Sequence, residues 1–246
     1  MSIPVTDRYS RMRPMGIDMD ALHSARCLVV GAGALGNEVV KNMVLAGFGN
    51  ITIVDDDHVS NSNLSRCLFF RQSDTRKANK AEVVAKRAAE LGTDCRISPI
   101  PSRVQDIDIE GYDLILGCMD NILSRLHVNA HACHHRIPYI DGATHGLRGK
   151  VHTVLPGRAC LQCIMNPTHA SESERRFSCT GYEVYVTPVP SDITTTSVIA
   201  GIQVREAMKL LSDMDCQDGI CYYDGLSGTM ELLRAGIDRE CPNHGA

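Results

Sequence analysis

The chain has 246 residues, which is enough for one large α/β domain or two small ones without disulfide bonds to stabilise them. Its net charge of −4, with no stretch that concentrates Lys and Arg, excludes a general nucleic-acid-binding surface. No apolar run approaches the ~20 residues that cross a bilayer, and the first residues lack the charged and apolar regions of a secretory signal. Eleven cysteines in such a chain favour reduced thiols, metal ligands or a nucleophile. We therefore expect a cytoplasmic protein that binds neither nucleic acid nor membranes.

Short apolar runs alternate with helical patterns over the first 141 residues. This alternation is typical of βαβ units and predicts a largely parallel, Rossmann-like sheet. We expect strands over 27–31, 51–54, 95–100, 113–117 and 137–141. We expect helices over 18–24, 34–46, 78–91 and 121–135.

The pattern changes after residue 141. Segments 149–155 and 221–233 alternate polar and apolar residues as antiparallel strands do, and 193–211 has a helical period. Residues 166–191 are polar, contain proline and show no clear period, so we interpret them as a long surface crossing. The predicted fold class is α/β, with a Rossmann-like, mostly parallel sheet, an antiparallel extension and a zinc knuckle. We expect one domain over 1–246, with 1–25 as an N-terminal arm and 160–192 as a crossover segment.

A glycine motif lies between the first expected strand and the helix that follows it. Gly31, Gly33 and Gly36 match G-x-G-x-x-G. Glycines permit a tight turn and the close approach of backbone N–H groups to phosphate, and a helix N-terminus attracts negative charge. Asp55 ends the second strand, where an acidic side chain can bind ribose hydroxyls. This context predicts a nucleotide site; the alternative is a plain tight turn with a solvated acid.

The residues after the second strand distinguish ATP from a dinucleotide. Asn63, Arg66 and Lys80 place polar and cationic groups where a dehydrogenase usually has none. Asp120 and Asn121 follow a strand at its carboxyl end, where the ligands of open α/β sheets bind. An Asp there can hold Mg²⁺ against a triphosphate, and the two cations can neutralise phosphate charge. The set favours ATP and Mg²⁺, although each cation taken singly also fits a solvated surface.

Two pairs of soft or borderline metal ligands are each separated by two residues, a spacing typical of zinc sites. They are Cys160 with Cys163, and Cys241 with His244. Two such knuckles would bring 241–244 back to the crossover segment. Because a closed set of four leaves no open coordination position, the predicted Zn²⁺ is structural. The alternative is a pair of free thiols beside an unbound tail.

Several stretches of the chain resemble the ubiquitin-activating enzyme superfamily, which includes the MoeB, ThiF and HesA proteins. The matching stretches are 8–11, 29–36, 55–57, 63–66, 80–82, 118–121 and 160–163. The resemblance implies an enzyme that adenylates the C-terminal glycine of a ubiquitin-like or sulfur-carrier protein ending in Gly-Gly. It further implies that Arg11 enters the neighbouring subunit's site as an arginine finger, and hence a homodimer.

The resemblance also implies roles for residues of the nucleotide site. Asp55 would bind the ribose, and Asp120 would hold Mg²⁺. The phosphates would be bound by Asn63, Arg66 and Lys80. The full set of expected nucleotide-binding residues is Gly31, Gly33, Gly36, Asp55, Asp57, Asn63, Arg66, Lys80, Asp120 and Asn121.

Three positions depart from the family pattern. Arg66 is followed by Cys67, where the family usually has Gln. The segment before Lys80 lacks the usual Gly and is one residue longer, so both Lys77 and Lys80 are candidates for the catalytic lysine. His244 stands where the family has a fourth cysteine, and histidine is an ordinary zinc ligand.

Cys179 is the candidate nucleophile. Cys179-Thr180 resembles the Cys-Thr segment of conjugation-type members, in which the cysteine takes the activated carboxylate as a thioester. Arg175 and Arg176 precede it, and cationic neighbours raise the thiolate fraction of an exposed thiol. The alternative is a structural or incidental cysteine.

Four histidines form a second cluster in the expected helix 121–135. His127, His131 and His135 share a helix face at i, i+4 spacing, and His134 lies beside them. No acidic partner or third element is evident from the sequence. We interpret them as ordinary polar or packed histidines rather than a metal site.

The sequence therefore predicts an ATP- and Mg²⁺-dependent activating enzyme with a structural Zn²⁺. Its expected catalytic residues are Arg11, Arg66, Lys80, Asp120 and Cys179. The partner would be a ubiquitin-like or sulfur-carrier protein, and a conjugating enzyme is a possible second partner. The alternatives are a sulfur-carrier adenylyltransferase without a thioester step, an NAD-dependent oxidoreductase and a catalytically silent scaffold subunit. The cationic set and the zinc ligands argue against the oxidoreductase, and Asp120 with the lysines argues against the scaffold.

Overall fold

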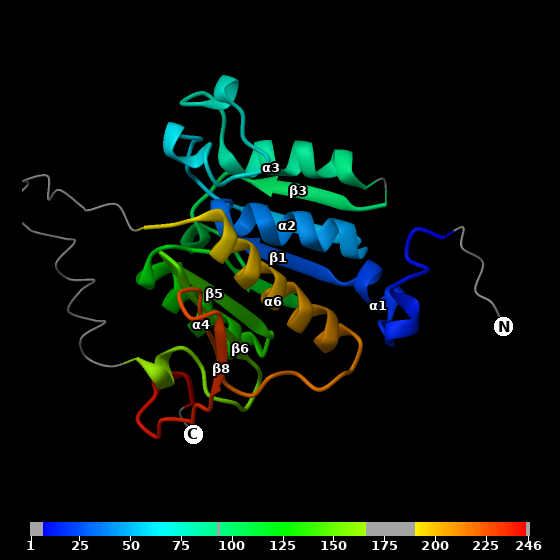
Figure 1. The fold of residues 1–246 in the computed structure, drawn as a ribbon. Helices are drawn as coiled ribbons and strands as arrows, with labels where there is room; N and C mark the ends of the chain where they lie inside the picture. Colours follow the sequence, from blue (N-terminus) through cyan, green and yellow to red (C-terminus); the bar gives the residue numbers. More distant parts are fainter. Residues whose placement is uncertain (1–6, 93, 166–189, 245–246) are drawn as a thin grey trace, which may run out of the picture.

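The computed structural model describes residues 7–92, 94–165 and 190–244. Across these residues one sheet of eight strands runs through the molecule, in the order β3-β2-β1-β4-β5-β6-β7-β8 (Figure 1). Neighbours from β3 to β5 pair in parallel, and neighbours from β5 to β8 pair antiparallel. The predicted α/β class, with a parallel core and an antiparallel extension, is confirmed. The strands are β1 (Arg26–Val30), β2 (Asn50–Val54), β3 (Arg96–Ile100), β4 (Leu114–Gly117), β5 (Tyr139–His145), β6 (Arg148–Val154), β7 (Ile220–Asp224) and β8 (Thr229–Leu233).

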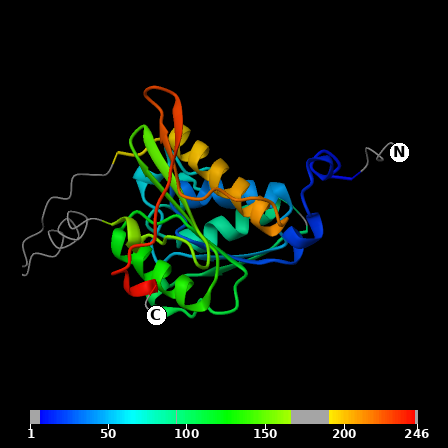
Figure 2. The same ribbon diagram turned by 90° about the horizontal axis from the view of Figure 1, so that it is seen from below.

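Helices cover both faces of the sheet. Figure 2 shows α6 on one side of the sheet and α4 on the other, with the C-terminal η7 beside α4. The α-helices are α1 (Met19–Ser24), α2 (Ala34–Ala46), α3 (Lys80–Ala88), α4 (Ile122–His135) and α6 (Ile193–Leu211). The short 3-10 helices are η1 (Arg13–Met15), η2 (Asn61–Asn63), η3 (Gln72–Asp74), η4 (Ala89–Leu91), η5 (Val104–Asp106), η6 (Gln162–Ile164) and η7 (Pro242–His244).

The sheet separates two apolar cores. Val29 of β1 belongs to the core that α2, α3 and α6 cover, together with Val39 and Ile199. The preceding residue, Leu28, belongs to the core beneath α4, together with Val128. Successive side chains of a strand point to opposite faces, and both faces of β1 are covered. This is why the parallel strands have continuous apolar sequences rather than alternating ones.

The bounds of α2 and α6 agree with the prediction. Most other predicted elements differ from it by one residue at an end, and α3 and β5 differ by more. α3 begins at Lys80 rather than at residue 78, because the Asn79 side chain caps it by accepting a bond from the Glu82 N–H at 3.2 Å. The expected last turn of this helix, Ala89–Leu91, is a 3-10 helix. β5 continues to His145 rather than ending at Asp141, because β6 pairs with its whole length.

None of the described helices combines the length and apolarity needed to cross a bilayer. Most of the predicted crossover segment, including Cys179, lies outside the described residues.

Candidate nucleotide and metal sites

A cleft of about 540 Å³ opens at the carboxyl ends of the parallel strands. It is bordered by the ends of β1, β2, β4 and β5 and by the first turns of α2 and α4. The strand order reverses between β1 and β4, which is where open α/β sheets bind their ligands. Of the expected nucleotide-binding residues, all except Gly36 line this cleft.

The glycine loop needs its glycines for two different reasons. Gly31 has φ +100°, and a Cβ there would lie 2.7 Å from the carbonyl oxygen of Cys118. A Cβ on Gly36 would lie 1.9 Å from the carbonyl oxygen of Gly31, so any side chain would push α2 away from the loop. Gly33 is the N-cap of α2, so the free N–H groups of the first turn border the cleft and suit an anion.

Asp55 connects the glycine loop to the end of β2. Its carboxylate accepts bonds from the backbone N–H groups of Ala32 at 2.6 Å and Asp57 at 2.9 Å. Burial raises the pKa of Asp55, against the opposing effect of Lys80 and these two N–H groups. Asp55 therefore holds the loop in place at the edge of the cleft, where a nucleotide's ribose is expected.

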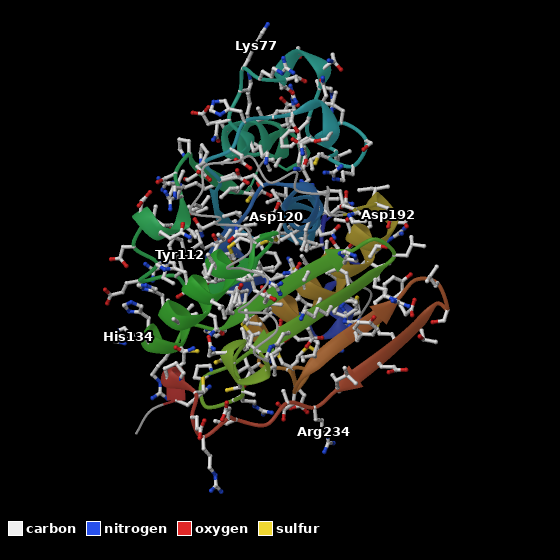
Figure 3. All side chains as sticks on the ribbon, turned by 90° about the vertical axis from the view of Figure 1, so that its left-hand side faces the viewer. Lys77, Tyr112, Asp120, His134, Asp192 and Arg234 are labelled. Carbon is white, nitrogen blue, oxygen red and sulfur yellow. The ribbon has the colours of Figure 1, made fainter. Side chains whose placement is uncertain are left out.

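Lys80 reaches the cleft and Lys77 does not. The Nζ of Lys80 lies 2.6 Å from the Asp57 carboxylate. Burial by itself would lower the pKa of Lys80, but the charges of Asp55, Asp57 and Asp120 outweigh it and the pKa is raised. Figure 3 shows Lys77 at the outer tip of the molecule, away from Asp120, and Lys77 is exposed. Of the two candidates for the catalytic lysine, Lys80 therefore lines the cleft and Lys77 does not.

Asn63 and Arg66 come from the excursion between β2 and α3. Asn63 is buried and its Oδ1 accepts from the Ser60 N–H at 2.9 Å. Arg66 donates from Nη1 to the carbonyl oxygen of Ser62 at 2.7 Å. Both residues line the cleft.

Asp120 and Asn121 occupy the turn between β4 and α4. Asp120 is exposed and lines the cleft, where a carboxylate oxygen is a suitable ligand for Mg²⁺. The Oδ1 of Asn121 accepts from the Ser124 N–H at 2.8 Å and caps α4. Asn121 therefore has a structural role in addition to its place in the cleft.

Sequence reasoning missed a buried ion pair beneath the cleft. Arg125 lines the cleft, and its guanidinium makes two bonds to the fully buried carboxylate of Asp141. Tyr139 also donates to Asp141, at 2.7 Å. Burial would lower the pKa of Arg125, but Asp141 outweighs it, so the pKa is raised and the charge is permanent. The available signal was an arginine one turn after Asn121 and an acid in an apolar strand.

The four expected metal ligands meet on the α4 side of the sheet. Their ligand atoms all lie within 4.8 Å of one another, and Cys160 Sγ lies 3.8 Å from Cys163 Sγ and 3.7 Å from Cys241 Sγ. The buried Nε2 of His244 has no hydrogen-bond partner among the described residues. Three thiols and one imidazole at this spacing are a closed zinc donor set.

The surroundings of Cys160 also fit a metal-bound thiolate. The pKa of Cys160 is lowered by hydrogen bonds, first from Cys133 and then from Asn129 and Asn243. Donors of this kind stabilise negative charge on sulfur, as the outer partners of a metal ligand do. The residues present therefore fit a structural Zn²⁺, which would join the chain end to the segment after β6.

Arg11 lies far from the cleft of its own chain. Tyr9 packs against Gly47, just beyond the last residue of α2, whereas the first turn of α2 borders the cleft. The 13 residues of α2 separate these points by roughly 20 Å at 1.5 Å per residue. Arg11 is exposed at this opposite end, so the structure does not bring it to Arg66, Lys80 or Asp120 of the same chain.

A model of the ThiF family matches residues 9–243. The chain belongs to the ThiF family. It is therefore a member of the E1-like superfamily of enzymes that activate ubiquitin and ubiquitin-like proteins, and the resemblance seen in the sequence is confirmed. The prediction of an E1-like activating enzyme is confirmed with it.

Individual relatives differ in how much of the chain they match. The SAMP-activating enzyme E1 of Haloferax volcanii is 30% identical, over 96% of this chain and 87% of that protein. The sulfur carrier protein ThiS adenylyltransferase of Bacillus subtilis is 29% identical, over 98% of this chain and 72% of that protein. The ubiquitin-activating enzyme E1-like protein of Saccharomyces cerevisiae is 34% identical over 60% of this chain, which spans only 24% of that protein.

The fold also recurs in solved structures. The crystal structure of Escherichia coli MccB with ATP superposes with a TM-score of 0.81, over 98% of this chain and 75% of that chain. The two sequences are 20% identical, so this likeness supports the fold alone.

Proposed function

We propose that the chain uses ATP and Mg²⁺ to adenylate the C-terminal carboxylate of a ubiquitin-like or sulfur-carrier protein ending in Gly-Gly. The observation that supports this is the cleft itself. It combines a phosphate-binding glycine loop with Arg66 and Lys80 and with an exposed carboxylate, Asp120. The reaction needs ATP, and the three cysteines of the proposed zinc site need to stay reduced. Both conditions hold in the cytoplasm, so we place the enzyme there.

The reaction is an in-line substitution at phosphorus. A carboxylate oxygen forms a bond to the α-phosphorus of ATP, and the bond from that phosphorus to the oxygen bridging to the β-phosphate breaks. Pyrophosphate leaves with the bonding electrons, and an acyl-adenylate remains. Lys80 and Arg66 hold the phosphates and stabilise the charge that develops on their oxygens. Mg²⁺ held by Asp120 would supply further positive charge to the same oxygens.

We propose that residues 1–246 act as one adenylation domain within a homodimer. Arg11 would complete the partner's cleft rather than its own, because roughly 20 Å of helix lies between its arm and the cleft of the same chain. A structural Zn²⁺ on Cys160, Cys163, Cys241 and His244 would join the start of the crossover segment to residues 241–244.

The second step separates two proposals. In the first, the Cys179 thiolate attacks the acyl carbon of the adenylate, AMP leaves and a thioester forms, ready for a conjugating enzyme. In the second, the enzyme is a sulfur-carrier adenylyltransferase and the adenylate is the product. This alternative is supported by the relative named as a sulfur carrier protein ThiS adenylyltransferase, which matches 98% of this chain.

The adenylation proposal is tested by ATP–pyrophosphate exchange with candidate small proteins ending in Gly-Gly. We expect exchange with the wild type and a loss of ~100-fold or more in Asp120→Asn, because the charged ligand that would hold Mg²⁺ against the phosphates is removed. Asp215→Asn, an exposed acid beyond the far end of α6, is the matched control. Full exchange in Asp120→Asn would remove that residue from the metal role.

The thioester step is tested separately with Cys179→Ala. Adenylation precedes thiol attack, so this variant should keep pyrophosphate exchange. If Cys179 is the acceptor, only the wild type should form an ATP-dependent adduct that reducing agent cleaves on a gel. An adduct that persists in Cys179→Ala would move the nucleophile to another cysteine, and no adduct in either protein would favour the sulfur-carrier reaction.

A further inference from the structure

The helix α4 carries a histidine pair that neither the cleft nor the cysteine cluster uses. The ring centroids of His127 and His131 lie 4.4 Å apart, with the ring planes tilted by 41°. The two residues are one turn apart at i, i+4 and share one face of the helix. We propose that His127 and His131 together chelate one divalent transition-metal ion on the outer surface of α4.

The geometry suits two imidazole ligands on one ion. A metal–nitrogen distance of about 2.1 Å requires the two donor nitrogens to lie roughly 3 Å apart. Rings whose centres are 4.4 Å apart can each turn one nitrogen to a common point without moving the backbone. Imidazole is a good ligand for Zn²⁺, Ni²⁺ and Cu²⁺, and water can fill the remaining coordination positions because His131 is exposed.

The other two histidines of α4 do not belong to this site. His135 is 6.4 Å from His131, and two turns of helix, about 12 Å, separate it from His127. His134 packs edge-on against His135 and lies on the outer side of the molecule in Figure 3. His134 therefore offers a control residue of the same type on the same helix.

Burial, and then the neighbouring charge of His131, lower the pKa of His127, which favours the neutral form of the ring. The pair is also separate from the cysteine cluster. The α4 residues in hydrogen-bond contact with that cluster are Asn129 and Cys133, which at about 100° per residue lie on the opposite face of the helix from His127 and His131.

An ion at this position would brace the helix that borders the cleft. It would link His127 to His131 across one helical turn, which begins two residues after Arg125. The first turn of α4 supplies Asn121, Ser124 and Arg125 to the cleft. The inference does not rest on the proposed adenylation, because it concerns metal binding and helix stability alone.

The test is a calorimetric titration of Ni²⁺ into the full-length, zinc-saturated protein. We expect the wild type to bind one further equivalent and to melt at a higher temperature with Ni²⁺ present, because a ligand that binds only the folded state stabilises it. His127→Gln and His131→Gln should each weaken this binding by at least ~10-fold, since a single imidazole remains. His134→Gln should bind as the wild type does.

A second measurement checks that the variants are folded. Melting without Ni²⁺ should give the same temperature for all four proteins, which shows that the substitutions leave the fold intact. The absence of a further equivalent in the wild type would overturn the proposal. Undiminished binding in His127→Gln or His131→Gln, or an equal loss in His134→Gln, would overturn it as well.

Discussion

At the residue scale, Lys80 and Lys77 are three positions apart and have different surroundings. The Lys80 side chain is only 12% exposed and ion-paired in the cleft, whereas Lys77 is exposed at the outer tip (Figure 3). We expect Lys80→Ala to lower ATP–pyrophosphate exchange by ~100-fold or more, because a charge-stabilising group is lost. Lys77→Ala is the matched control and should keep the wild-type rate. Equal losses in the two variants would contradict the assignment of Lys80 to the phosphates.

The residues that could be predicted from the sequence are those next to a strand end or within a motif. Gly31, Asp55 and Asp120 each follow a strong apolar strand, and the carboxyl ends of parallel strands meet at one edge of a sheet. The pair of Arg125 and Asp141 could not be predicted, because the two residues are 16 positions apart on different elements and show no local spacing. The capping role of Asn121 was equally hidden, since it depends on where α4 begins.

At the element scale, two glycines inside helices have opposite surroundings. A Cβ on Gly36 of α2 would lie 1.9 Å from the carbonyl oxygen of Gly31, whereas one on Gly201 of α6 would meet nothing within 4 Å. We expect Gly36→Ala to destabilise the protein and to abolish ATP binding, because α2 must move away from the loop. Gly201→Ala should stabilise it by roughly 0.5–1 kcal/mol through helix propensity. Thermal melting and nucleotide titration check both, and a Gly36→Ala protein that binds ATP normally would disprove the close approach.

Elements could be predicted best where both ends carried a chemical signal. α2 lies between the cap Gly33 and Gly47, whose φ is +94°, and its predicted bounds are confirmed. The start of α3 was predicted two residues early, because the apolar period does not reveal that the Asn79 side chain caps the helix. The length of β5 depends on its pairing with β6, and such non-local pairing has no signature within the strand itself.

At the scale of the whole molecule, the alternation of strands and helices was enough to predict the parallel core. Right-handed crossovers between parallel strands leave few arrangements open. The order of the antiparallel strands β6, β7 and β8 could not be derived, because several edge arrangements fit the same pattern. The meeting of Cys160 with Cys241 could be predicted across 81 residues, since a zinc donor set requires four ligands at one point.

Loss of the metal site should lower the thermal stability of the whole fold. We expect the purified protein to contain one zinc per chain by elemental analysis, and Cys241→Ser to lose it. Because each kcal/mol changes the melting temperature by roughly 2–4 °C in a domain of this size, we expect that variant to melt ~5 °C lower or more. Cys216→Ser, a half-buried cysteine outside the cluster, is the matched control. A Cys241→Ser protein that keeps both its zinc and its melting temperature would exclude this ligand set.

The last prediction concerns two chains. If Arg11 acts in the partner's cleft, Arg11→Ala and Asp120→Ala proteins should each be inactive alone and recover activity when mixed. In a mixed two-fold dimer, the cleft with an intact Asp120 faces the subunit with an intact Arg11, and the other cleft has neither. Random exchange makes about half of the dimers mixed, each with one working cleft of two, so exchange activity should return to roughly a quarter of the wild-type value.

The controls decide between action across the dimer and action within one chain. Arg13→Ala replaces a neighbouring arginine that pairs with Asp7 at 2.5 Å, and it should remain active and need no complementation. Subunit exchange must be shown independently, for example by fluorescence transfer between labelled chains. If exchange is complete and activity stays at zero, Arg11 does not act across the dimer. Since its arm lies at the far end of α2 from its own cleft, an essential Arg11 without complementation would then require the arm to move by the length of that helix.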